Sequence, residues 1–89
     1  MAISGNPLAM ARDIGEGFLS LSPAALKKYT PADLKTIHNS LQQVLRDARG
    51  EAVPQDDQEA IRRKNLRLQR LNQAIMTLAN YCRQQRIPL

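Results

Sequence analysis

The sequence has few aromatic residues. Its 89 residues include no tryptophan and only Phe18, Tyr29 and Tyr81 as aromatics. A hydrophobic core must then be built from Leu, Ile, Ala and Met, and aliphatic side chains suit packed helices better than a sheet or a ligand pocket. We expect one small domain, residues 1–89, close to the lower size limit for a core that is stable by itself.

Cysteine and histidine each occur once. Cys82 has no partner for an intrachain disulfide, which fits a reducing compartment; it is either a small buried apolar residue, as we prefer, or a site for pairing between chains. His38 has no Asp, Glu or Cys three or four residues away, so it is interpreted as a boundary residue. The cluster Asp56, Asp57 and Glu59 is typical of a helix start. The sequence therefore predicts no catalytic residue, no metal, no cofactor and no small-molecule substrate: the protein is expected not to be an enzyme.

Long apolar runs are also missing. No stretch approaches the ~18 uncharged apolar residues of a membrane-spanning helix. The N-terminal residues lack the basic start and apolar run of a secretory signal. We expect the protein to lie in the cytoplasm or inside an intracellular or viral assembly.

A capping residue followed by proline occurs three times, and this pair is typical of a helix start. The pairs predict short N-terminal helices within residues 1–29 (about Leu8 to Leu19, and Pro23 to Tyr29) and a third helix within residues 30–50 (Pro31 to Arg49), which stops at Gly50. The three pairs are Asn6-Pro7, Ser22-Pro23 and Thr30-Pro31. Asp33 stands where a capping box with Thr30 needs it. Gly15 and Gly17 should weaken the first helix by roughly 1 kcal/mol each relative to alanine.

The longest stretch without Gly or Pro runs from Asp56 to Arg86, and it predicts one long helix. Its apolar residues recur at steps of seven, three and four, which gives a narrow apolar seam: Ile61, Leu68, Leu71, Ile75, Leu78 and Cys82. A second seam follows Thr30: Leu34, Ile37, Leu41, Val44 and Ala48. The short connection, residues 51–55, favours antiparallel neighbours. The predicted fold is all-α: a long antiparallel helical hairpin, coiled-coil-like, with one or two short N-terminal helices across it and a tail, residues 87–89.

Two helices of this size leave apolar residues uncovered, so a homo-oligomer or a protein partner is expected. The predicted protein interface consists of seam residues and two aromatics: Leu68, Leu71, Ile75, Leu78, Phe18 and Tyr81.

Positive charge is concentrated in the C-terminal third. The net charge is +5, and residues 60–89 contain seven basic residues and no acidic one. On a helix, Arg63, Arg67 and Arg70 fall within about 60° of one another beside the seam; we call these three the arginine ridge. With Arg62 and Lys64 they are candidate contacts for an anion or a nucleic acid.

Three interpretations of the ridge stay open. In the first, its arginines are solvated or form ion pairs within the chain, although the facing helix offers only Asp33 and Asp47 as partners. In the second they contact an acidic protein, and in the third they bind the phosphate backbone of a nucleic acid. Lys64 occupies a seam position, where it either fixes register or lies at the loop end and extends outward.

The leading hypothesis is a non-enzymatic protein-protein interaction or assembly protein, a helical adaptor or structural component of a larger complex, for example in a phage or a secretion system. The alternative is a basic nucleic-acid-binding regulator that uses the arginine ridge.

Overall fold

The computed structural model describes residues 7–88, so Asn6, the predicted cap of the first helix, lies outside the described residues. Over this range the fold is all-α, as predicted. Four helices follow one another: α1 (Pro7–Glu16), α2 (Pro23–Leu26), α3 (Pro31–Gly50) and α4 (Gln58–Gln84). α1 and α2 each end three residues earlier than expected.

The start of α3 is fixed by its own side chains. The Thr30 hydroxyl accepts a hydrogen bond from the Asp33 N–H at 3.1 Å, and the Asp33 carboxylate accepts one from the Thr30 N–H at 3.3 Å. The predicted capping box is therefore confirmed. Ser22 caps α2 in a simpler way, through a 3.3 Å bond from the Ala25 N–H.

α4 is the longest helix, with 27 residues. Asp57 is its cap and accepts a hydrogen bond from the Ala60 N–H at 3.0 Å. At the other end Arg86 adopts a left-handed conformation with φ of 57°. Its N–H bonds to the Arg83 carbonyl at 3.2 Å, and the Ile87 N–H reaches the Cys82 carbonyl at 2.8 Å. This pair of bonds is a Schellman motif, so the helix ends before Pro88 is reached.

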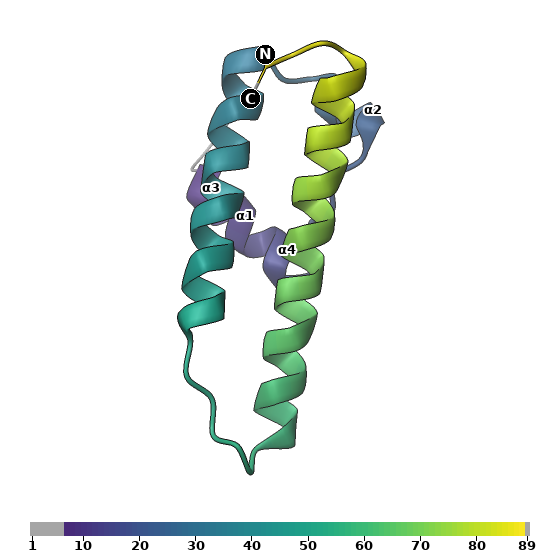
Figure 1. Cartoon of the computed structure of the whole chain (residues 1–89). Coiled ribbons are helices and arrows are strands. Elements are labelled where there is room, and N and C mark those ends of the chain that lie inside the picture. The colour runs from purple at the N-terminus through teal and green to yellow at the C-terminus, as the bar shows by residue number, and fades with distance from the viewer. Residues whose placement is uncertain (1–6, 89) are drawn as a thin grey trace.

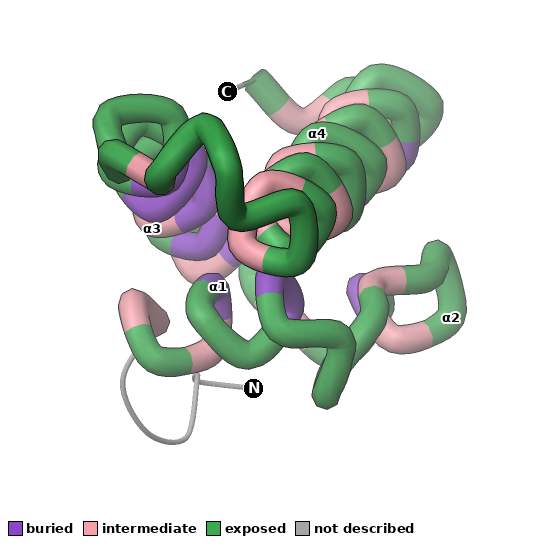
Figure 2. The backbone as a smooth tube through the Cα atoms, turned by 90° about the horizontal axis from the view of Figure 1, so that it is seen from below, coloured by how far each residue is buried: buried purple, intermediate pink, exposed green. Residues whose placement is uncertain are grey.

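The helices form two layers. α3 and α4 lie side by side and run in opposite directions (Figure 1). α1 packs across both of them and α2 packs against α4, so that the buried positions of α3 face α1 (Figure 2). The molecule measures 45 × 25 × 19 Å.

One core lies between these layers. Its largest fully buried side chains come from α2, α3 and α4, and α1 adds Ala11 and Ile14. Leu8 and Met10 of α1 also pack against this core while partly exposed. The N-terminal helices therefore cover seam surface on α3 and α4. The fully buried set is Leu26, Leu34, Ile37, Leu41, Leu71, Leu78 and Cys82.

Candidate functional site

Five of the six residues predicted as a protein interface lie in or against the core. Leu71 and Leu78 have no exposed surface and Tyr81 is 9% exposed. Leu68 and Ile75 are partly buried and pack on the same core. The sixth, Phe18, is 82% exposed. Contact of these residues with another chain stays a prediction, and Phe18 is the one that projects from the surface.

The end of α1 explains the exposure of Phe18. Gly17 is left-handed, with φ of 86°, and its N–H bonds to the Ile14 carbonyl at 3.1 Å. The Phe18 N–H then reaches the Asp13 carbonyl at 2.9 Å. In such a turn the residue after the glycine usually packs on the side chain five positions earlier. That side chain is the exposed, charged Asp13, which gives Phe18 no apolar surface to pack on.

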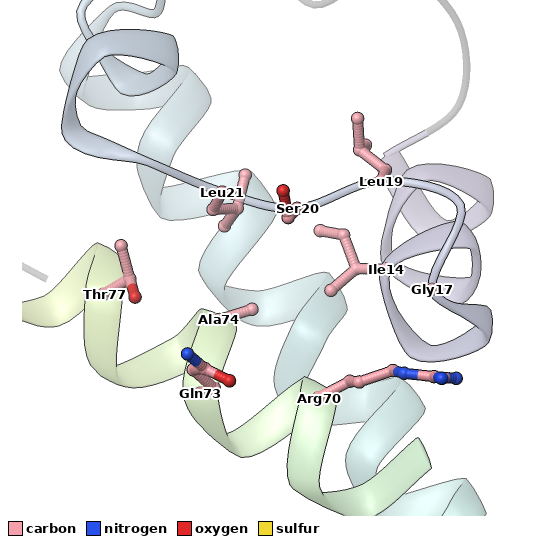
Figure 3. Close-up of a pocket in the computed structure, with 9 residues that line it drawn as sticks. All are labelled: Ile14, Gly17, Leu19, Ser20, Leu21, Arg70, Gln73, Ala74 and Thr77. Atoms are coloured by element: carbon pink, nitrogen blue, oxygen red, sulfur yellow. The ribbon is translucent and has the colours of Figure 1, made fainter. Parts of the chain in front are cut away.

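A groove lies next to this turn. It has a volume of about 240 Å³ and is bounded by α1, by the segment that follows it and by α4 (Figure 3). Leu19, 41% exposed, lies on its wall beside Phe18 in the sequence. Sequence reasoning missed the groove because its walls come from three separate segments. The lining residues are Ile14, Gly17, Leu19, Ser20, Leu21, Arg70, Gln73, Ala74 and Thr77.

Two members of the arginine ridge bind groups within the chain. Arg67 forms ion pairs with Glu16 at 3.1 Å and with Glu51 at 2.6 Å, and its side chain is 27% exposed. The sequence had offered Asp33 and Asp47 on α3 as ion-pair partners, and Arg67 binds neither of them. Asp33 is held in the capping box, and the two carboxylates that Arg67 binds lie on α1 and on the connection. Arg67 therefore joins three parts of the fold.

Arg70 holds the end of α1. Its guanidinium donates a 3.3 Å hydrogen bond to the Gly15 carbonyl, and a cation is favourable at the C-terminal end of a helix. A Cβ atom at Gly17 would lie 3.0 Å from Arg70 Cζ, and one at Gly15 would lie 3.1 Å from Arg67 Cγ. The two glycines permit this close approach of α1 to α4.

The other basic candidates lie near the connection between α3 and α4. Lys64 donates to the Glu51 carbonyl at 2.6 Å and to the Arg49 carbonyl at 3.3 Å, so it extends from its seam position to the end of α3. Arg62 and Arg63 are exposed and form no ion pair with any residue from 7 to 88. Only these two of the five candidates keep a charge that is not engaged within the described chain.

Cys82 is 1% exposed, in agreement with its interpretation as a small buried residue, and burial raises the pKa of its thiol. His38 is half-buried, and its Nε2 lies 3.5 Å from the Gln42 amide nitrogen.

Residues 7–88 contain no group of three His, Cys, Asp or Glu side chains placed to hold a metal ion. No helix in that range has the length and apolar character needed to cross a membrane.

Comparison of the chain with protein-family models, with curated proteins and with solved structures finds no match.

Proposed function

We propose that this chain is a non-enzymatic protein-protein interaction or assembly protein, a helical adaptor or structural component of a larger complex such as a phage particle or a secretion system. The observation that carries the proposal is the exposure of Phe18, 82%, beside Leu19 and an open groove. In this proposal α3 and α4 form a long antiparallel hairpin with coiled-coil-like packing, and the complex is cytoplasmic or lies inside an intracellular or viral assembly.

An exposed phenylalanine next to a groove has the form of a binding hot spot. Burial of a phenylalanine side chain contributes about 1.5–3 kcal/mol. Binding energy is usually concentrated in a few such anchors that meet a pocket on the partner. Here the anchor and a pocket are neighbours, so a partner can bury Phe18 and place a side chain of its own between Ile14 and Ala74.

The turn that presents Phe18 is held in place before binding. Gly17 packs on the guanidinium of Arg70, which itself bonds to Gly15. A contact that is already positioned loses less conformational entropy on association than a mobile one. This supports a stable protein partner or a second copy of the chain.

Site-specific photo-crosslinking in the source cell tests the proposal. A photoreactive phenylalanine analogue at position 18 is expected to give a defined crosslinked product, whose mass identifies either a second copy or another protein. The same analogue at Gln43, an exposed position on α3, is the control. Equal crosslinking from both positions, or none from position 18, would contradict the proposal.

The nucleic-acid alternative is less well supported at the ridge itself. Arg67 and Arg70 already bind groups on α1 and the connection, and Lys64 bonds to carbonyls at the end of α3. Of the five basic candidates, only Arg62 and Arg63 would then be left to contact an anion.

A further inference from the structure

The net positive charge is gathered at one end of the molecule. Around the connection, residues 46–64, five basic residues are matched by five acidic ones. At the opposite end, α3 begins where α4 finishes, and the segment after α2 leads into the start of α3 (Figure 1). Five basic residues lie on these segments; we call them the basic end: Lys27, Lys28, Lys35, Arg83 and Arg86.

The charges of the basic end are available to bind an external anion. All five residues are exposed, and within residues 7–88 none of their side chains forms an ion pair. The one acidic residue on the same segments, Asp33, bonds to the Thr30 N–H in the capping box. The basic end thus differs from the arginine ridge, whose Arg67 is neutralised by two carboxylates.

The backbone of Arg86 is a second, independent observation. α1 ends in the same kind of turn as α4, and there the left-handed position is occupied by Gly17. A side chain with a Cβ is disfavoured in this conformation, because the Cβ comes too close to the following carbonyl oxygen. The chain therefore carries an arginine where glycine would be more stable, and a local cost of this kind is typical of functional positions.

The composition of the basic end favours phosphate over a protein surface. Three of its five residues are lysines, which protein interfaces disfavour. Large exposed apolar residues within 7–88 are Phe18, Leu19 and Met76, of which Met76 lies about two turns before the end of α4. Peripheral membrane binding is strengthened by apolar side chains that insert, and none of these three lies on the segments of the basic end.

Duplex nucleic acid fits better than a single strand. Single-strand binding relies on exposed aromatic rings on which bases stack. The two tyrosines nearest the basic end pack against the core, Tyr81 buried and Tyr29 half-buried. We propose that the basic end binds the phosphate backbone of double-stranded nucleic acid without reading its sequence.

Salt-dependent binding tests this inference. For a labelled DNA duplex of about 20 base pairs, five phosphate contacts predict an affinity that falls about 500-fold between ~50 and ~200 mM salt. The variant Lys27→Gln/Lys28→Gln/Arg83→Gln removes three contacts, so its affinity should fall only about 12-fold over the same range and be weaker at low salt.

The matched control removes the same charge from outside the basic end. Arg12→Gln/Arg46→Gln/Arg49→Gln, at three exposed positions, should keep the salt dependence of the unmodified protein. If both triple variants lose affinity equally, if no duplex binds at ~50 mM salt, or if anionic lipid vesicles bind while duplex DNA and duplex RNA do not, the inference is overturned.

Arg86→Gly separates binding from folding. It should raise the melting temperature, because glycine tolerates the left-handed conformation, and it should weaken duplex binding. Unchanged duplex binding by this better-folded variant would contradict the inference, because Arg86 is one of its five phosphate contacts. Failure of the inference leaves the Phe18 crosslinking result untouched, because the two sites share no residue.

Discussion

Gly17 makes a contact that a residue with a Cβ atom cannot make without strain. Its φ is 86°, and an added Cβ would lie 3.0 Å from Arg70 Cζ. From the sequence, Gly15 and Gly17 could be judged only by helix propensity, since the approach of Arg67 and Arg70 depends on how α1 crosses α4. Gly15 lies within α1 and weakens it as an isolated helix, whereas Gly17 lies just beyond α1 and ends it; together they allow α1 to dock closely on α4.

Gly17→Ala should lower the free energy of unfolding by about 1–2 kcal/mol, because of the left-handed backbone and the contact with Arg70. Gly50→Ala is the control: nothing lies within 4 Å of its Cβ position, and it should be neutral or stabilising by up to about 1 kcal/mol. Thermal unfolding followed by circular dichroism measures both, and equal changes in the two variants would contradict the assignment.

At the scale of elements, the position of α1 is fixed by polar contacts as well as by the core. Arg67 on α4 holds Glu16 on α1 and Glu51 beside the end of α3. The starts of α2, α3 and α4 could be predicted because caps and apolar spacing are local signals. The partners of Arg67 could not, because no local pattern says which face of the α3–α4 pair α1 will cover.

Arg67→Gln should therefore loosen α1. The carboxylates are about half exposed, so water and salt weaken the pairs, and a loss of about 0.5–1 kcal/mol is expected at ~50 mM salt. At ~1 M salt the difference from the unmodified protein should shrink. Urea unfolding at both salt concentrations measures it. The control is Arg63→Gln, at an exposed residue without an ion-pair partner in the described chain, which should change stability by less than about 0.5 kcal/mol. If Arg63→Gln lost as much stability as Arg67→Gln, the loss would come from net charge and not from the ion pairs.

At the scale of the whole molecule, one core joins all four helices. The apolar spacing on the two long helices predicted most of that core, including Leu34, Leu71 and Leu78. Ala11 and Ile14 complete it from α1, and their docking leaves Phe18 and the groove outside. The spacing could not show that Phe18 alone of the six predicted interface residues would project from the surface, because that exposure results from the turn at Gly17. The candidate site is therefore a consequence of how α1 docks on α3 and α4.

Cys82 reports on this shared core. It lies near the end of α4 and is 1% exposed, so reagent can reach its thiol only when the core opens. Labelling by a thiol reagent should be at least about a hundredfold slower in the native protein than in urea. Labelling at the same rate in both would mean that the end of α4 is open in the native state.

The same thiol gives stability a pH dependence of known sign. Burial raises the pKa of Cys82 above 9.0, its ordinary value, so only the unfolded chain ionises it readily. Its contribution to stability is complete below that value and is lost as the pH rises above it. Unfolding free energies from pH 8 to pH 10 should therefore fall more steeply for the unmodified protein than for Cys82→Ala. Parallel curves would mean that the thiol has the same surroundings in the folded and unfolded chain, and the assignment of Cys82 to the core would then be wrong.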